Sequence, residues 1–422
     1  MKRLLYAVAL LGLGGPAWAG GYQVSLQGQK QIGMAHTGTG LALDPAALFF
    51  NPGAMSHLRE NGFTVGGSAI FGATAFVADG SNRTYRTDNP VGTPFAAYAV
   101  WGPTPETVSQ VKFGIGVYTP YGSSVQWEDE WAGRYALQQL SLRAISVQPT
   151  VSYNIVDRVG IGAGFVYTFG GVNLQRDLPI ASQNGDPATV ELDGSARGFG
   201  FNIGLFVQPV DAVSVGLSYR SRIDMRVDEG SADFRVPGAA RASFPADNTF
   251  DAELPLPAVA SVGLGIQVTE RLLLAVDANL TFWSAYDSLT FTYTEALTVE
   301  GLPTSRTSSP RAYEDALALR LGAQFKATEA LALRAGAYYD QTPVQDGYLT
   351  PETPDADRLG VSLGVGYRIG GVEIDASLLF ITGAEREQTD ADIDAAGTAG
   401  DVLAGRYQLG AVIPGVSASY RF

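Results

Sequence analysis

Residues 145–154, ISVQPTVSYN, alternate between two kinds of side chain. The odd-numbered positions hold Ile, Val, Pro, Val and Tyr, whereas the even-numbered positions hold Ser, Gln, Thr, Ser and Asn. Because successive side chains of a β-strand point to opposite faces, this period of two predicts a strand with one apolar and one polar face. The same alternation recurs at 159–167, 213–220 and 359–368. We therefore predict an all-β fold from about residue 61 onward.

The connections between the predicted strands separate two kinds of β protein. A soluble sandwich also has alternating strands, but a transmembrane barrel joins them by tight periplasmic turns and long outer loops in turn. Short turns are predicted at 156–158, 209–212, 269–271, 328–330 and 370–371. Long polar loops are predicted near 76–92, 120–138, 176–195, 229–256, 296–313, 341–357 and 382–404. This rhythm predicts an antiparallel transmembrane barrel of about 14 strands, an even number that returns both chain ends to the periplasm.

The composition agrees with such a barrel. Only 17% of the 422 residues are charged, 51 are glycine and none is cysteine. After the first twenty residues, no apolar run approaches the roughly 20 residues of a transmembrane helix. Lipid-facing and lumen-facing side chains alternate along barrel strands, which brings the mean hydropathy close to neutral. The net charge of −14 argues against nucleic acid and anionic membrane surfaces as partners.

Both chain ends carry features of export. Lys2 and Arg3 precede the apolar run 4–13 and the small-residue site Ala17-Trp18-Ala19, which predicts a signal peptide over residues 1–19. At the other end, Tyr420 and Phe422 share one face of an alternating strand. A terminal Phe of this kind resembles the signal by which outer-membrane barrels are delivered for assembly. We therefore expect the outer membrane as location and the barrel assembly machinery as a partner.

Residues 41–58, LALDPAALFFNPGAMSHL, interrupt the strand pattern. Their prolines cannot donate to a sheet ladder, and an irregular apolar segment needs walls that bury it and satisfy its backbone. We predict that residues 20–60 form a plug, or hatch, inside the barrel that residues 61–422 build. Asn51 is expected to cap a helical turn with Pro52 at its first position; contact of this pair with a ligand is the alternative.

Several motifs resemble the FadL-type family of outer-membrane transporters for long-chain fatty acids and other hydrophobic compounds. Residues 21–24, GYQV, resemble the start of that family's hatch, and 49–55 resemble its Phe-Asn-Pro-Ala-Gly-Met motif with Ala and Gly exchanged. Segments 131–135, 282–284 and 355–358 also look familial. By this resemblance, the family's hatch motif corresponds in this chain to Phe49, Phe50, Asn51, Pro52 and Gly53.

The resemblance implies a monomeric barrel of fourteen strands plugged by the hatch. In such proteins a hydrophobic ligand lands among the outer loops, moves to a pocket against the hatch, and leaves into the membrane lipid through a gap at a kinked third strand. The third strand is expected at 110–119 in this chain. The corresponding kink would lie at Thr119, Pro120, Tyr121 and Gly122, although an ordinary strand end is equally compatible with these residues.

Candidate ligand contacts follow from the chemistry of a fatty acid. Apolar side chains in an outer loop suit a hydrophobic landing site, and a buried carboxylate needs a cation. The apolar candidates are Phe234, Phe244, Phe250 and Leu254 in the loop 229–256, with Trp127 and Trp131. The cationic candidates facing the lumen are Arg220, Arg320 and Arg334. Alternatively, these arginines pair with the lumenal carboxylates Asp277, Glu373 and Asp375.

Catalysis is not predicted, because the chain lacks cysteine, shows no nucleophile motif or metal-ligand spacing, and has only His36 and His57, both in the hatch. No cofactor is expected. The predicted function is passive uptake of a hydrophobic small molecule, foremost a long-chain fatty acid. Neutral aromatic hydrocarbons or alkanes are the alternative cargo. A general diffusion porin, which would lack a plug, and a surface adhesin are alternatives of another class.

Overall fold

The computed structural model describes residues 20–103, 111–180, 187–299, 301–398, 400 and 402–422. The predicted signal peptide, residues 1–19, lies outside these described residues. Among the described residues, no helix is both long enough and apolar enough to cross a membrane.

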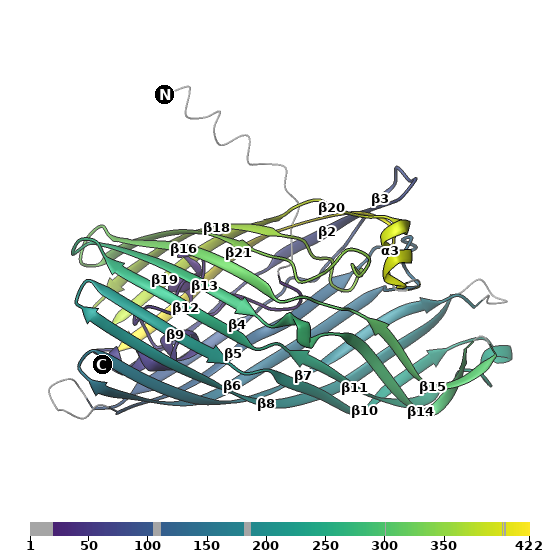
Figure 1. Cartoon of the computed structure of the whole chain (residues 1–422), viewed down its shortest axis with the longest axis horizontal. Helices are drawn as coiled ribbons and strands as arrows, with labels where there is room; N and C mark the ends of the chain where they lie inside the picture. Colours follow the sequence, from purple (N-terminus) through teal and green to yellow (C-terminus); the bar gives the residue numbers. More distant parts are fainter. Residues whose placement is uncertain (1–19, 104–110, 181–186, 300, 399, 401) are drawn as a thin grey trace, which may run out of the picture.

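Fourteen antiparallel strands close into a barrel, as the alternation and the turn rhythm predicted (Figure 1). The unbroken strands are β5 (Val111–Gln126), β6 (Gln139–Val156), β7 (Val159–Leu178), β8 (Ala188–Val210), β17 (Leu331–Asp340), β18 (Arg358–Ile369), β19 (Val372–Gly383) and β21 (Gly405–Arg421). The other strands each consist of two segments in line. These are β1 (Gly62–Ser68) with β2 (Phe71–Ala78), β3 (Thr84–Arg86) with β4 (Phe95–Trp101), β9 (Val213–Arg220) with β10 (Ile223–Arg235), β11 (Asp247–Leu256) with β12 (Val259–Gln267), β13 (Leu272–Thr281) with β14 (Ser288–Val299), and β15 (Leu302–Pro310) with β16 (Ala316–Lys326).

The first strand closes the barrel on the last one. β1 pairs with β21 from Gly62↔Arg421 to Ser68↔Gly415, and β2 continues along the same strand. The outer surface is apolar, with large side chains that are about half exposed to the surroundings. Examples are Val151, Phe165, Phe199, Leu321, Leu363 and Val416. Such a band is stable when it faces lipid.

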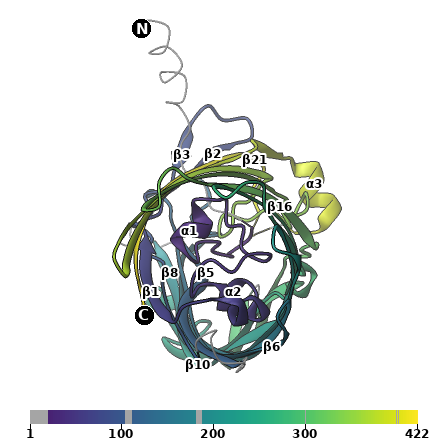
Figure 2. The ribbon, with the colours of Figure 1, turned by 90° about the vertical axis from the view of Figure 1, so that its left-hand side faces the viewer.

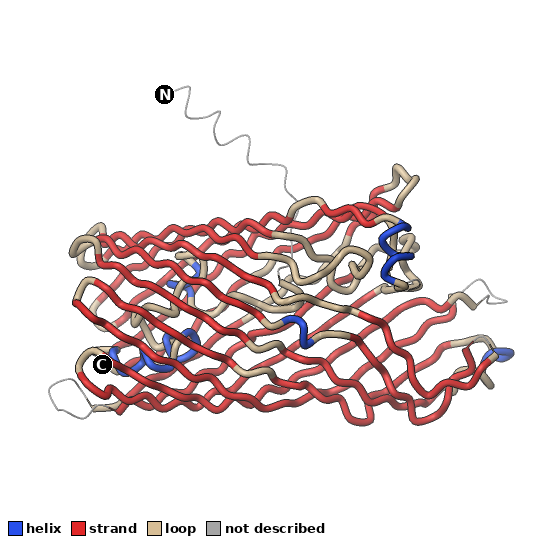
Figure 3. The backbone as a smooth tube through the Cα atoms, in the orientation of Figure 1, coloured by secondary structure: helices blue, strands red, loops and turns tan. Residues whose placement is uncertain are grey.

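The two ends of the barrel differ in their connections (Figure 3). The predicted short turns join β6 to β7, β8 to β9, β12 to β13, β16 to β17 and β18 to β19, at the end where the C-terminus lies. We call this the short-turn end. The helix α3 (Asp390–Ala396) and the short strand β20 (Arg386–Gln388) lie toward the opposite, long-loop end.

Several of the predicted long loops are wrong in extent, since β5 runs into 120–138 and β8 into 176–195, and two hairpins show the error most clearly. In the segment 229–256, β10 continues to Arg235 and β11 begins at Asp247. In the segment 296–313, β14 ends at Val299 and β15 begins at Leu302. These hairpins extend the barrel strands with polar residues, because a ladder partner can satisfy the backbone whether or not the side chains are apolar. The polar composition of these two segments therefore led to the wrong prediction that they are loops.

Three short helices fill the lumen near the short-turn end (Figure 2). They are α1 (Gln29–Ile32), α2 (Ala47–Phe50) and the 3₁₀ helix η1 (Pro52–His57). Asn51 caps η1, because its side-chain oxygen accepts a hydrogen bond from the Gly53 amide at 3.0 Å, which confirms the capping interpretation. The Asn51 amide group also donates to the carbonyls of Thr39 at 2.9 Å and Leu205 at 3.0 Å, so it joins two parts of the hatch to β8.

The hatch backbone lies directly against the barrel backbone at glycine positions. A Cβ atom on Gly53 would lie 2.6 Å from the carbonyl oxygen of Gly160 and 2.8 Å from that of Gly204. Likewise, a Cβ atom on Gly40 would lie 2.7 Å from the carbonyl carbon of Gly263. Glycines on the inner faces of β7, β8 and β12 thus make room for the main chain of the hatch.

Substituting Gly53→Val should displace the hatch from β7 and β8, because overpacking of this kind costs about 1–3 kcal/mol. We expect a higher ionic conductance of the variant than of the wild-type protein in planar bilayers, with the barrel still folded. Gly238→Val is the matched control, since a Cβ atom at Gly238 meets nothing within 4 Å. If the Gly53 variant had the same conductance as the wild-type protein, the contact of Gly53 with β7 and β8 would not be what closes the lumen to ions.

Candidate functional site

One of two cavities against the N-terminal part of the hatch is almost entirely apolar. We call it the apolar cavity; Tyr22 of the hatch forms part of its wall. Its other apolar lining comes from β6, β7, β8, β10, β11 and β14 and from Tyr286. It includes Leu142, Leu174, Met225, Val227, Leu254 and Phe291. The charged residues Arg143, Glu253 and Glu352 also line it.

The apolar residues predicted from segment 229–256 belong to the large hydrophobic cluster that also includes lining residues of this cavity. Leu254 lines the cavity itself, and the ring of Phe250 lies 5.4 Å from that of Phe291, which also lines it. Phe234 packs on Phe244 with ring centroids 5.6 Å apart. Except for Phe244, these side chains are carried by strands and not by the loop that was predicted.

Trp127 and Trp131 belong to the same hydrophobic cluster but do not line the cavity. Their rings stack 4.1 Å apart, and both are almost fully buried. The Trp127 indole donates to the Pro351 carbonyl at 3.2 Å, and the Trp131 indole donates to that of Leu137 at 2.7 Å. Neither is among the described residues that line the apolar cavity. The structure therefore places both tryptophans in the packing of the long-loop end.

The second cavity joins the hatch motif, two of the predicted arginines and the predicted kink. We call it the arginine cavity. Gln23 and Val24 line it, so residues 22–24 lie at the boundary between the two cavities. The residues that matter for its chemistry are His36, Phe49, Pro120, Tyr121, Arg220, Arg320 and the carboxylate Asp340, which pairs with Arg358 at 3.5 Å.

Arg220 and Arg320 point their guanidinium groups at the hatch. Arg220 donates to the Phe49 carbonyl at 2.7 Å and lies 3.7 Å above the centroid of the Phe49 ring. Arg320 donates to the Asn279 side-chain oxygen at 2.8 Å and to the Ala35 carbonyl at 3.4 Å. Within the ranges that the structure describes, neither arginine has a carboxylate partner at ion-pair distance. Both are cations held mainly by neutral groups.

Arg334 differs, because it is paired. Its guanidinium lies 2.7 Å from the Asp375 carboxylate and 3.7 Å from that of Glu373, which Lys30 of the hatch also contacts at 2.9 Å. The interpretation that lumenal charges pair with one another is therefore right for Arg334. Arg220 has no carboxylate within ion-pair distance among the described residues, and Arg320 lies directly opposite Asp277 in the β13–β16 ladder without reaching ion-pair distance. The third carboxylate, Asp277, instead accepts hydrogen bonds from the hatch amides of residues 38 and 39, both at 2.9 Å.

The pairing of β5 is irregular at the residues where the sequence predicts a kink. Its pairing with β6 shifts register between Tyr118 and Tyr121, and its pairing with β4 ends at Tyr118. Beyond that point β5 continues to Gln126, further than the predicted strand end at residue 119. The unpaired edge bonds to the hatch instead: the Val24 amide donates to the Pro120 carbonyl at 2.9 Å, and Gly122 donates to the Tyr22 carbonyl at 3.0 Å. A hatch segment thus occupies the edge that β4 leaves free.

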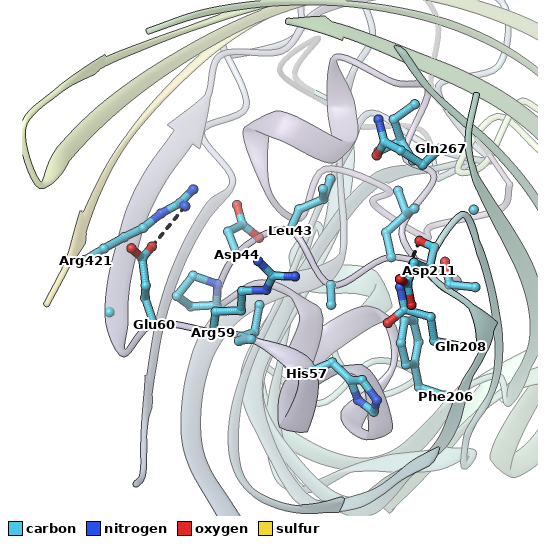
Figure 4. A pocket seen from close by; sticks show the side chains of 18 of the residues that line it. Leu43, Asp44, His57, Arg59, Glu60, Phe206, Gln208, Asp211, Gln267 and Arg421 are labelled. Carbon is cyan, nitrogen blue, oxygen red and sulfur yellow. Dashed lines mark hydrogen bonds and ion pairs between the residues drawn. The ribbon is translucent and has the colours of Figure 1, made fainter. Parts of the chain in front are cut away.

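A third cavity, of about 550 Å³, lies between the hatch and the short-turn end (Figure 4). Leu43, Asp44 and His57 of the hatch line it, and Arg421 pairs with Glu60 at 3.2 Å on its rim. Segment 41–45 lines this cavity, whereas Thr39 and Phe49 line the arginine cavity. The hatch is thus the barrier between them.

His36 is a site residue that sequence reasoning did not select. Its ring lies 4.7 Å from that of Phe50, and its Nε2 atom lies 3.1 Å from the side-chain oxygen of Gln27. Burial, together with the nearby Arg320 and Arg220, lowers the pKa of His36 well below its ordinary value. In the sequence, His36 stands out only as a single histidine in a run rich in Gly and Thr. Its position in the site could not be predicted, because Arg220 and Arg320 come from strands far along the chain.

Comparison with known proteins agrees with this architecture. A family model described as outer membrane protein transport protein (OMPP1/FadL/TodX) matches residues 11–422. The chain belongs to this family. A family relative, the long-chain fatty acid transport protein of Salmonella typhi, is 22% identical over 410 residues, covering 89% of this chain and 91% of the relative.

Two solved structures share the fold. A FadL homologue of Pseudomonas aeruginosa superposes with a TM-score of 0.80 at 21% identity, covering 95% of this chain and 100% of that one. The toluene transporter TodX of P. putida superposes with a TM-score of 0.71 at 17% identity, covering 94% and 98%. As a member of this family, the protein is an outer-membrane barrel, and its short-turn end faces the periplasm. In the described part of the chain, no group of three or more His, Cys, Asp or Glu residues could hold a metal ion.

Hatch docking should weaken as the pH falls below about 6.5, the ordinary pKa of histidine. Burial lowers the pKa of His36 and of His57, so the docked hatch binds fewer protons than an undocked one below this pH. We expect a higher ionic conductance of reconstituted barrels at pH 5.5 than at pH 7.5. The variant His36→Asn, which suits the positive φ of this position, should reduce the difference, and adding His57→Asn should remove it. An unchanged pH dependence in the double variant would contradict this origin.

Proposed function

We propose that this protein carries long-chain fatty acids passively across the outer membrane. The observation that carries the proposal is the arginine cavity, where Arg220 and Arg320 lack carboxylate partners among the described residues. An apolar cavity lies on the other side of residues 22–24. A cation site next to an apolar site is the pattern that an amphipathic acid requires.

The two cavities divide the free energy of binding between them. Burial of a methylene group contributes about 0.8 kcal/mol, so about ten buried groups give about 8 kcal/mol without any hydrogen bond. The carboxylate, in contrast, is costly to bury unless a cation pairs with it. Arg220 and Arg320 supply that cation, whereas Arg334 is already occupied by Asp375 and Glu373.

A lateral exit into the membrane lipid is the route that we propose. Pro120 and Tyr121 line the arginine cavity at the kink of β5. Next to them, residues 22–24 of the hatch are hydrogen-bonded to the free edge of the strand. Withdrawal of this segment would connect the cavity with the gap between β4 and β5. The hatch motif and the kink then act together, with the hatch as the gate.

Neutral aromatic hydrocarbons are the second candidate cargo. The predominantly apolar lining of the apolar cavity favours them, and the structurally similar TodX is named a toluene transporter. The name of the Salmonella relative supports the fatty acid instead. We propose transport and not catalysis, adhesion or open diffusion, since the hatch helices lie inside the lumen and a cavity lined by two arginines adjoins an apolar one there.

Uptake of a labelled long-chain fatty acid would test the proposal. Cells that lack their own transporter would display this protein in the outer membrane, with toluene and an alkane as competing cargoes. We expect uptake of the acid at least several-fold above cells with an empty vector. A heat-modifiable shift of the barrel on gels would show that the protein is folded. Uptake of toluene alone by folded protein would overturn the acid in favour of the hydrocarbon.

A further inference from the structure

Two arginines lie on the outer wall of the barrel at one level, Arg197 on β8 and Arg226 on β10. Both side chains are exposed, whereas the residues next to them in the chain, such as Val227, line the apolar cavity inside. Each arginine is 13 positions from the end of its strand at the short turns, which is Val210 for β8 and Val213 for β9 and β10 in line. A strand that rises about 3.3 Å per residue at a tilt of about 40° climbs about 33 Å over that length. The two arginines therefore lie at the outer boundary of a hydrocarbon core about 30 Å thick.

These two arginines oppose each other in the sheet. Arg226 is the partner of Arg197 in the antiparallel ladder of β8 and β10, and like charges in direct opposition destabilise a sheet. Arg226 donates to the Glu253 carboxylate at 3.0 Å, but in the described part of the chain the side chain of Arg197 has no hydrogen bond and no ion pair. Glu253 also pairs with Arg222 at 3.7 Å, and Arg222 pairs with Asp224. Three arginines thus share two carboxylates, which leaves one positive charge unbalanced.

Aromatic rings form a shelf beside Arg197. Phe169 of β7 is the ladder partner of Arg197, and Phe199 follows two positions later on the same face of β8. The centroid of the Tyr167 ring lies 5.1 Å from that of Phe199 and 5.8 Å from that of Phe169. Phe199 is 60% exposed, so its ring faces the surroundings of the barrel and not its interior. Exposed rings at this level belong to the aromatic girdle that contacts lipid.

We propose that Arg197 and Arg226 bind the phosphate of an outer-leaflet lipid whose acyl chains lie on this shelf. Because the short-turn end faces the periplasm, the level of the arginines is that of the outer headgroups. A guanidinium binds phosphate through two parallel hydrogen bonds, and no described residue occupies the fork of Arg197. One phosphate between the two arginines attracts both and so removes the cost of their repulsion. The site does not depend on which cargo the barrel transports.

Acidic side chains on the solvent side favour a lipid over a free anion as the ligand. Asp193, Asp228 and Asp251 are exposed on the same strands, further toward the long-loop end. Asp193 accepts a hydrogen bond from Asn173 at 3.1 Å, and Asp251 accepts one from the Glu229 amide at 2.9 Å. These carboxylates and the net charge of −14 repel an anion that arrives from solution. A lipid phosphate instead arrives along the membrane, so the site is a local exception to the charge of the whole chain.

Binding of lipid A, whose headgroup carries two phosphates, tests the site. The full chain would be purified in a nonionic detergent with EDTA, which removes divalent cations that would otherwise bridge phosphates to the carboxylates. The dissociation constant for lipid A would be measured by calorimetry, beside that for the same lipid with both phosphates removed. We expect lipid A to bind about tenfold more tightly, since only its phosphates form charge-assisted hydrogen bonds with the two arginines.

Variants of the two arginines give the second arm of the test. Arg197→Gln combined with Arg226→Gln should abolish the preference for lipid A and leave the affinity for the dephosphorylated lipid unchanged. Arg197→Lys keeps the charge but loses the planar fork, so part of the preference should remain. The matched control is Arg158→Gln, because Arg158 is also exposed and paired, with Asp211 at 3.3 Å, but lies at the short-turn end. A heat-modifiable shift on gels would show that each variant is folded.

Equal affinity for lipid A and its dephosphorylated form would overturn the proposal, as would a double variant that binds lipid A like the wild-type protein. Displacement of lipid A by an equal concentration of inorganic phosphate would also overturn it, because the ligand would then be a free anion. Fatty acid uptake by the double variant should equal that of the wild-type protein. Failure of the lipid site and failure of the proposed function are therefore distinguishable.

Discussion

The structure depends on contact between main chain and main chain inside the barrel. Glycines on the inner wall let the hatch approach so closely that polar groups of wall and hatch must satisfy one another. The Gln148 amide donates to the Leu48 carbonyl at 2.9 Å, and Ser214 donates to that of Gly40 at 2.6 Å. The polar faces of these strands therefore form hydrogen bonds with the hatch. In a porin, a polar face of the same period would line a water-filled pore.

The charged side chains in the lumen fall into two groups, those that form ion pairs and those that contact neutral groups. Lys30 of the hatch meets Glu373, and Arg334 meets Asp375, so this side of the lumen is closed by ion pairs. On the other side, Arg220 and Arg320 contact carbonyls, an amide and aromatic rings. These two arginines have capacity for an anion, and they lie where the irregular part of β5 and the N-terminal segment of the hatch meet.

Much of the fold could be predicted because its signals are local. Alternation with period two, the tight turns and the cap at Asn51 each involve residues a few positions apart, where side-chain direction and backbone geometry leave little choice. The same locality explains the failure at 229–256. A polar composition predicts a loop, but the ladders of β10 and β11 with neighbouring strands depend on partners far along the chain.

The sequence by itself determined the barrel and its even number of strands, since both follow from period-two alternation and the spacing of turns, and its motifs indicated the outer membrane by resemblance. Only the tertiary structure decided which arginines are paired and which cavity they line. Arg320 reaches Ala35 across 285 positions of the chain, and Arg220 reaches Phe49 across 171. Such contacts form when the barrel closes around the hatch, and alternation can assign a side chain to the lumen without telling which group it meets there.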